Sequence, residues 1–156
     1  MKQHLKKIAA PKSWLIKRKE GKFITRPKPG AHNLKLGLPI NVILRDVLGF
    51  AKSTKEVKRI LNNKEVLVDN KRCLNYRMLV GLFDVISVPE VKKYFRLILD
   101  TKGRIKVIEI NEKDAKNKVC KIINKTIIKK GQTQLNLNDG KNIIVDKKYN
   151  VGDSIV

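Results

Sequence analysis

The sequence predicts an α+β fold, in which a basic N-terminal arm precedes a small two-helix module with short strands and then a β-rich domain. Basic residues, prolines and glycines dominate the start of the chain, apolar residues recur at helical spacing between residues 40 and 61, and strand-like runs follow. We expect the arm to span residues 1–37, the module 38–92 and the β-rich domain 93–156. The chain stops on a predicted strand, so we expect the last domain to be incomplete at its C-terminus.

The charge of the chain restricts the kinds of partner it can have. Its 156 residues include 36 Lys or Arg and 14 Asp or Glu, for a formal net charge of +22. Such self-repulsion destabilises a compact chain unless a polyanion neutralises it. Nucleic acid is the first candidate and an anionic membrane surface the second, although no segment approaches the ~20 apolar residues of a membrane span. Cys73 and Cys120 lack metal-ligand spacing, so we expect an intracellular protein without a disulfide or metal site.

The arm is basic without being of low complexity. Its first 30 residues hold ten of the cations and a single acid, together with three prolines. Alone, such a stretch buries little surface and should be extended or loosely ordered. Apolar residues nevertheless interrupt the charges, namely Trp14, Leu15, Phe23 and Ile24. They indicate either an arm that orders against a partner or an arm that packs on its own domain, and both interpretations stay open.

Residues 38–63 carry the signals for two helices. Positions 40, 43, 44, 47, 48 and 51 are apolar at helical spacing, with Pro39 at a first-turn position. Residues 53–56 (STKE) have the spacing of a capping box, so a second helix should begin at Ser53 and end at Asn62 and Asn63. Its apolar stripe would be Val57, Ile60 and Leu61. Three cations would lie away from that stripe, namely Lys55, Lys58 and Arg59.

Strands and turns are predicted for the rest of the chain. Residues 66–68 indicate a strand that turns at Asp69 and Asn70, and residues 80–88 indicate another strand. Hairpins are expected over 95–110 and over 133–145, the latter around Asp139 and Gly140. Residues 111–118 between them could form a short helix.

If the turn after residue 68 lies beside the outer face of the second helix, five cations form one basic surface: Lys55, Lys58, Arg59, Lys71 and Arg72. Such a surface neutralises phosphates and releases counterions. The helix N-terminus at Ser53 would add amide donors and a positive dipole end. A solvated polar face, which any surface helix has, is the alternative, and charge alone favours that alternative.

The order of these elements, with a DNK turn (69–71) and a closing G-x-x-D-x-I-x-V strand (81–88), resembles the αL RNA-binding module. That module occurs in a bacterial small-subunit ribosomal protein, some aminoacyl-tRNA synthetases and pseudouridine synthases. Six phrases make the resemblance more specific: HLKKIAAPKSW (4–14), TRPKPGAH (25–32), LPINVILRDVLGFA (38–51), VGLFDVISVPE (80–90), LDTKGRI (99–105) and QLNLNDGKNI (134–143). Together they resemble the archaeal and eukaryotic small-subunit ribosomal protein four, e-type family, over nearly the whole chain.

The resemblance implies a non-enzymatic structural constituent of the small ribosomal subunit, cytoplasmic and within the ribosome, that binds and clamps rRNA during translation. Small-subunit rRNA and neighbouring ribosomal proteins would be its partners, with no membrane, no small-molecule substrate and no cofactor. The family also carries a C-terminal SH3-like barrel with a KOW motif, which this sequence does not contain. Asn70 stands where the family commonly has glycine, a change that a left-handed turn tolerates.

RNA contacts are expected from two groups of cations. The arm group comprises Lys6, Lys7, Lys12, Lys17, Arg18, Lys22, Arg26 and Lys28. The helix–hairpin group comprises Lys55, Lys58, Arg59, Lys71 and Arg72. Folded RNA is recognised mainly through its shape and backbone, with Trp14 and Phe23 as packing or stacking anchors in an arm that orders on binding. The lysines of residues 116–130 would add a second footprint.

Two other functions are compatible with parts of the sequence. A free RNA-binding or ribosome-assembly factor is the first alternative. An rRNA-modifying enzyme relative that lacks its catalytic domain is the second, because Leu99-Asp100-Thr101 echoes a pseudouridine synthase phrase, but Asp100 is better explained as a hairpin turn residue. His4 and His32 have no acids or cysteines at ligand spacing, so RNA contact or solvent exposure is expected of them.

Overall fold

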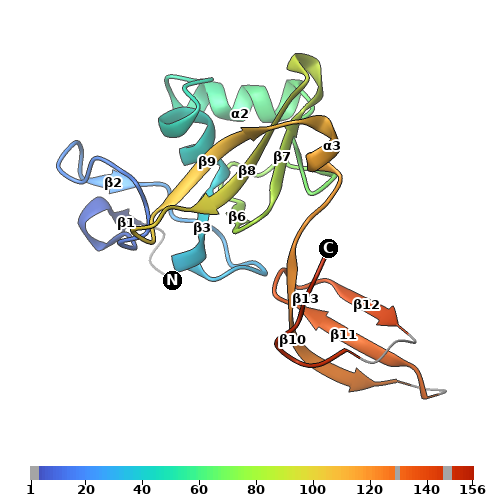
Figure 1. Cartoon of the computed structure of the whole chain (residues 1–156). Coiled ribbons are helices and arrows are strands. Elements are labelled where there is room, and N and C mark those ends of the chain that lie inside the picture. The colour runs from blue at the N-terminus through green and yellow to red at the C-terminus, as the bar shows by residue number, and fades with distance from the viewer. Residues whose placement is uncertain (1–3, 129–130, 146–148) are drawn as a thin grey trace. The chain divides into compact units, whose positions relative to one another are not determined.

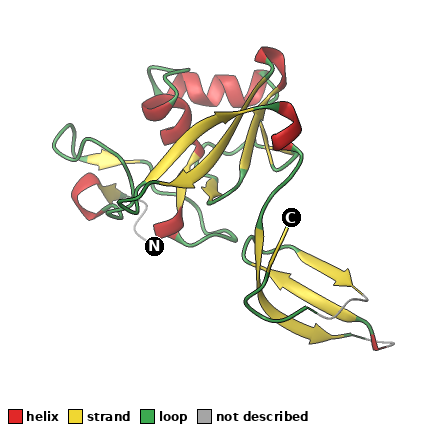
Figure 2. Cartoon of the chain, in the orientation of Figure 1, coloured by secondary structure: helices red, strands yellow, loops and turns green. Residues whose placement is uncertain are grey.

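The computed structural model describes residues 4–128, 131–145 and 149–156, and the chain divides into two compact units, Met1–Lys116 and Asn117–Val156 (Figure 1). Helices and a five-stranded sheet make up most of the first unit, and a four-stranded sheet makes up the second (Figure 2). The predicted α+β class is therefore confirmed. The domain boundaries expected near residues 37 and 92 remain a prediction.

The arm packs on the first unit. Its strands β1 (Leu5–Lys6) and β2 (Phe23–Ile24) pair antiparallel, with a 3-10 turn (Lys7–Ala9) after β1. The Trp14 side chain is 2% exposed within the core, and its Nε1 donates to the Leu34 carbonyl at 3.2 Å. Ile24 is buried in the same core, whereas Leu15 and Phe23 are exposed. Of the two interpretations of the arm, packing on its own domain is the one that holds for Trp14. The buried Trp14 ring is not available to stack on RNA.

The first predicted helix is present over residues 40–47, but it is not a single α-helix. A 3-10 turn (Leu34–Leu36) leads into strand β3 (Gly37–Pro39), followed by one turn of α-helix, α1 (Ile40–Val42), and a π-helix, η3 (Ile43–Val47). β3 stays extended because it pairs antiparallel with β6 (Leu79–Gly81). The wider π turn shifts the helical phase, and Val47, one of the apolar positions at helical spacing, is 41% exposed.

Helix α2 (Thr54–Asn63) confirms the second predicted helix. Ser53 Oγ accepts from the amide of Glu56 at 3.2 Å, as a capping box requires. The Glu56 carboxylate accepts from the amide of Lys52 at 2.7 Å, one residue before the expected partner. That hydrogen bond lowers the pKa of Glu56. Val57 and Leu61 are buried in the core, so α2 is attached through the predicted stripe.

The main sheet is antiparallel, in the order β5-β4-β7-β8-β9. Its strands are β4 (Leu67–Val68), β5 (Lys71–Arg72), β7 (Val85–Val88), β8 (Lys93–Leu99) and β9 (Ile105–Ile110). A 3-10 turn (Pro89–Val91) precedes β8 and helix α3 (Glu112–Ala115) follows β9. Both the hairpin expected over 95–110 and the short helix within 111–118 are confirmed. The sheet packs its apolar side chains with those of α2 in one core.

One turn of the first unit was not predicted from the sequence, and two others were. The single strand expected over 80–88 is wrong, because Phe83 takes a left-handed φ of +65° and separates β6 from β7. Asp69 and Asn70 are also left-handed, at φ +49° and +62°, as the DNK turn requires. Asp100 closes the β8–β9 hairpin by accepting from the Thr101 amide at 2.8 Å, as expected of a turn residue.

The second unit is a sheet in the order β12-β11-β10-β13. Its strands are β10 (Cys120–Ile127), β11 (Thr133–Leu137), β12 (Asn142–Val145) and β13 (Ser154–Ile155). The β11–β12 hairpin confirms the prediction for 133–145, and Gly140 has φ +77° in its turn. A small core of Cys120, Ile122, Leu135 and Leu137 lies beneath it.

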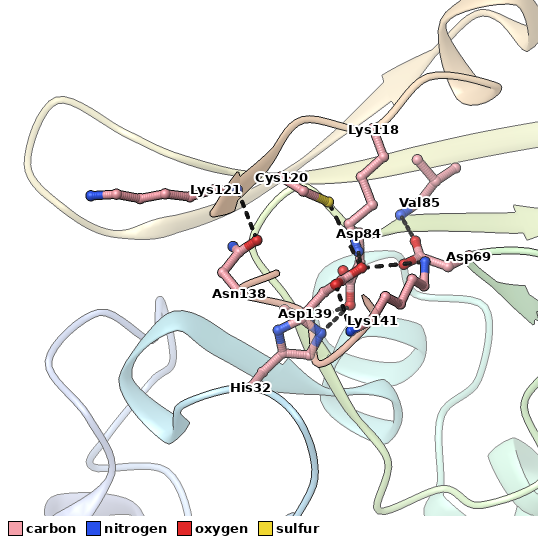
Figure 3. A network of polar contacts seen from close by, with 11 residues as sticks. His32, Asp69, Asp84, Val85, Lys118, Cys120, Lys121, Asn138, Asp139 and Lys141 are labelled. Carbon is pink, nitrogen blue, oxygen red and sulfur yellow. Dashed lines mark hydrogen bonds and ion pairs between the residues drawn. The ribbon is translucent and has the colours of Figure 1, made fainter. Parts of the chain in front are cut away.

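Asp139 anchors this turn from a buried position (Figure 3). Its carboxylate accepts from the Lys141 amide at 3.0 Å, and Lys118 Nζ and Lys141 Nζ lie 3.1 and 3.3 Å away. Burial opposes ionisation of the carboxyl, but the amide and the two ammonium groups outweigh it and lower the pKa of Asp139 to about 2.

We expect the second unit to lose stability as the pH falls from about 4 towards 2. The unfolded pKa of Asp is about 3.9, so a depressed folded pKa stabilises the unit above that value, and this contribution disappears as the pH falls through the folded pKa. Its size is about 2 kcal/mol. Urea unfolding followed by the NMR signals of β10 should show Asp139→Asn destabilising the unit at pH 7 and having almost no effect near pH 2. An equal effect at both pH values would contradict this assignment.

Candidate nucleic-acid interface

The helix–hairpin group lies along α2 and at its C-terminal end. Lys55, Lys58 and Arg59 are exposed on the helix. Arg72, in β5, donates from Nη2 to the Asn62 carbonyl at 3.1 Å, which holds the β4–β5 hairpin against the last turn of α2. Lys71 is exposed beside it. The turn that follows the strand therefore lies next to the helix, as the sequence predicted.

These five cations keep their charge unneutralised. Over residues 4–128, 131–145 and 149–156, none of them forms an ion pair with Asp or Glu. Lys64, the C-cap residue of the same helix, does pair with Glu90, at 2.7 Å. An exposed cation without an acidic neighbour is available to a phosphate, and phosphates bind such groups with release of counterions.

The first part of the arm group surrounds the loop between β1 and β2. Lys6, Lys12, Lys17 and Lys22 are exposed, and Lys17 pairs with Glu20 at 3.0 Å. Arg18 is different, because its guanidinium donates to the carbonyls of residues 7, 8, 10 and 11, at 2.7 to 3.4 Å. Lys7 Nζ likewise donates to the Glu20 carbonyl. Arg18 and Lys7 thus hold the loop that displays the other cations.

The second part of the arm group runs beside Arg77. The Lys28 amide donates to the Arg77 carbonyl at 2.9 Å, and Arg77 Nε donates to the Arg26 carbonyl at 2.8 Å. Arg77 was not predicted from the sequence, although it directly follows the aromatic Tyr76 along the chain. Lys58 Nζ lies 4.6 Å from the centroid of the Tyr76 ring, and Lys22 Nζ lies 5.6 Å from that of Phe23.

His32 does not match the expected RNA contact or solvent exposure. Its Nε2 lies 2.9 Å from Asp84 Oδ2, and both side chains are largely buried (Figure 3). Asp84 Oδ2 also accepts from the Gly81 amide at 2.7 Å. The pair therefore fixes the turn between β6 and β7. His4 lies at the surface, with its ring centroid 5.4 Å from that of Phe23.

The predicted second footprint over residues 116–130 is only partly described. Lys116 and Lys121 are exposed, and Lys125 Nζ donates to the Tyr149 carbonyl at 3.0 Å. Lys129 and Lys130 lie outside the described residues. Across the described ranges, no three His, Cys, Asp or Glu side chains cluster as metal ligands. In that same part of the chain, no helix has both the length and the apolar character needed to cross a membrane.

Fold and surface together define a small, strongly basic α+β protein whose exposed cations suit a polyanion. Three family models match consecutive parts of it: the RS4NT (NUC023) domain over residues 1–35, the S4 domain over 38–86 and Ribosomal family S4e over 91–156. The chain belongs to the ribosomal family S4e, which confirms the resemblance recognised in the sequence.

Individual relatives agree with this family. The small ribosomal subunit protein eS4 of Methanospirillum hungatei is 46% identical over 100% of this chain and 64% of its own length. The protein of the same name from Nanoarchaeum equitans is 39% identical over 100% of this chain and 67% of its own. The crystal structure of the 30S ribosomal protein S4e from Thermoplasma acidophilum matches with 30% identity and a TM-score of 0.61, over 76% of this chain and 60% of that one. The chain thus spans somewhat less than two thirds of the Methanospirillum relative.

Proposed function

We propose that this chain is a non-enzymatic structural constituent of the small ribosomal subunit that clamps rRNA during translation. The helix–hairpin group carries the proposal, because five exposed cations, without acidic partners among the described residues, lie along and beside one helix. The names of the eS4 relatives support the ribosomal assignment. Small-subunit rRNA and neighbouring ribosomal proteins would be the partners, in the cytoplasm.

The clamp would have two parts. Lys and Arg on α2 and β5 would neutralise phosphates along one stretch of backbone, which recognises RNA through shape rather than sequence. The arm would add Lys6, Lys12, Lys17 and Lys22, displayed on a loop that Arg18 holds together. Lys7 and Arg18 would act on RNA mainly through this loop, since their side chains already donate to carbonyls of the arm. No bond is made or broken in this role.

Neutralising the helix–hairpin group should flatten the salt dependence of rRNA binding. Each phosphate contact contributes about 0.9 to the slope of log K against log salt in duplexes. A variant with Lys55, Lys58, Arg59, Lys71 and Arg72 all changed to Gln should therefore lose about 4.5 from this slope. The measurement is a titration of small-subunit rRNA with the full chain at several salt concentrations.

A charge-matched control separates this site from the general attraction of a basic chain. Five cations elsewhere on the first unit are exposed and can be changed to Gln together: Lys92, Lys102, Arg104, Lys106 and Lys113. This control should keep most of the slope. Equal losses in the two variants would mean that the helix–hairpin group is not a phosphate-binding site.

A further inference from the structure

A pocket of about 340 Å³ lies where the arm meets the beginning of α2. We infer that it binds one unpaired nucleotide of RNA, with the phosphate on its arginines and the base against its aromatic rings. The inference rests on the proposed function, because it assumes an RNA partner, and it adds a site for a single nucleotide to a surface that otherwise meets only backbone. The volume falls in the range of about 300–1,000 Å³ typical of small-ligand sites.

Three arginines line the pocket, and their neighbours hold two of them in place. Arg77 donates from Nε to the Arg26 carbonyl at 2.8 Å, so the guanidinium is fixed along one edge. Arg45 comes from the π-helix and is held by Asp46, with Nε and Nη2 at 2.7 and 2.8 Å from its carboxylate oxygens. Because Asp46 and Thr54 already engage the Arg45 guanidinium, Arg77 is the group whose terminal nitrogens suit the bidentate recognition of phosphate. Asp46 neutralises the charge of Arg45, whereas Arg77 forms no ion pair among the described residues and still favours an anion.

The two threonines of the pocket present donors as well. Asn41 is fully buried behind them, and its Nδ2 donates to Thr25 Oγ1 at 2.5 Å and to Thr54 Oγ1 at 3.2 Å. Arg45 Nη1 donates to the same Thr54 oxygen at 3.2 Å. A hydroxyl oxygen that accepts such bonds keeps its own hydrogen to donate. The wall is therefore rich in donors, and the ligand must offer acceptors, as a phosphate does.

Asn41 adds a second sign of a ligand site. Its Oδ1 is buried and has no hydrogen-bond partner in the described part of the chain. Buried polar atoms are nearly always paired, and a departure from that rule in a well-packed core is expected at sites shaped for function rather than for stability. The atom belongs to the residue that orients both threonines of the pocket.

Aromatic rings complete the pocket. Phe23 is 50% exposed and stands against the His4 ring, and Tyr76 lines the same space. Unpaired bases stack on such rings, whereas bases inside a duplex are already stacked on one another. Lys22 and Lys58 lie over these two rings, so cations of the arm group and of the helix–hairpin group flank the pocket. A phosphate ion would leave the rings uncovered, and an apolar ligand would leave the arginines unpaired.

The test uses the full chain and a twelve-nucleotide single-stranded RNA with one central 2-aminopurine, whose fluorescence falls when the base stacks. The wild type should quench the probe and should not quench the same probe within a duplex. Phe23→Leu and Tyr76→Leu should each weaken binding about tenfold and reduce the quench, while Tyr76→Phe, which keeps the ring, restores it. Phe50→Leu is the matched control, since Phe50 is also an exposed ring of the first unit but does not line the pocket.

A second set of measurements tests the charge of the pocket. Arg77→Gln should weaken probe binding more than Arg104→Gln, which removes the same charge from the exposed β8–β9 turn. Inorganic phosphate should displace the probe only at concentrations well above those of a single-stranded RNA competitor. Phosphate that competes as well as RNA would identify an anion site only and overturn the nucleotide assignment.

The outcomes also separate this inference from the clamp. Tight, salt-dependent binding of small-subunit rRNA without any quench of the probe would overturn the pocket and leave the clamp intact. Quench that depends on Phe23 and Tyr76, in a chain that does not bind rRNA, would support the pocket and overturn the clamp. Quench that persists in both ring variants would place the stacked base elsewhere and overturn the pocket.

Discussion

Val57→Asp should unfold α2 and abolish binding of small-subunit rRNA. Val57 is fully buried and packs in the core together with Leu61 of the same helix. A carboxylate at this position would lose the apolar contacts and have no partner for its charge, which costs about 3–5 kcal/mol in a well-packed core. That is a large part of the ~5–15 kcal/mol that stabilises a typical domain. Urea unfolding and rRNA titration of the purified variant measure the two effects.

Lys55→Asp is the matched control within the same helix. Lys55 is exposed in the first turn of α2, where a negative charge is favoured by the helix dipole. The variant should therefore unfold like the wild type but bind rRNA more weakly, because a phosphate contact becomes a repulsion. Wild-type unfolding of Val57→Asp would mean that α2 is not held through this face.

Gly81→Ala should destabilise the first unit by about 2–4 kcal/mol, through overpacking and the loss of a buried polar pair. A Cβ at this position would lie 2.1 Å from His32 Nδ1 and 2.4 Å from two ring carbons. The ring cannot simply swing away, because its Nε2 is bound to the buried Asp84 carboxylate at 2.9 Å. Gly81 also pairs with Gly37 between β6 and β3, so the backbone has little freedom to yield. Urea unfolding of the purified variant gives the free-energy change.

The His32 ring can be removed to show that it causes the effect. His32→Ala is itself destabilising, but in that background Gly81→Ala should add much less than it does in the wild type. Gly30→Ala serves as the control, since a Cβ at Gly30 would meet nothing within 4 Å. If Gly81→Ala cost the same with and without His32, the ring would not be the obstacle.

Local signals predicted the elements that depend on neighbouring residues. The capping pattern at Ser53 located α2, and turn residues located the β8–β9 and β11–β12 hairpins. Strand β3 was missed because it depends on pairing between distant segments, whereas the break within residues 80–88 depends on the left-handed Phe83. β3 and β6 pair Gly37 with Gly81, 44 positions apart, and no local pattern had indicated that residues 37–39 form a strand.

In the candidate site too, features set by neighbouring residues could be predicted and features set by distant residues could not. The exposed cations could be recognised from charge and helical phase, because side chains on the helix face opposite the buried Val57 must be exposed to solvent. The pocket could not, because Thr25, Arg45, Thr54 and Tyr76 come from separate segments that only the folded arm brings together. Two signals were available in the sequence: a polar Asn41 within the largely apolar run LPINVILRDVLG, and Tyr76 next to Arg77. Arg18 was indistinguishable from its neighbours, since only the folded loop shows its carbonyl partners.

Sedimentation of native cell lysate through sucrose gradients, at moderate and at high salt, tests the central claim most directly. A chain built into the small ribosomal subunit should comigrate with small subunits and remain with them after the high-salt wash, because many phosphate contacts and the folded arm hold it there. A chain that stays at the top of the gradient, or that leaves the subunits when a little salt is added, would contradict the clamp and favour a free RNA-binding or ribosome-assembly factor.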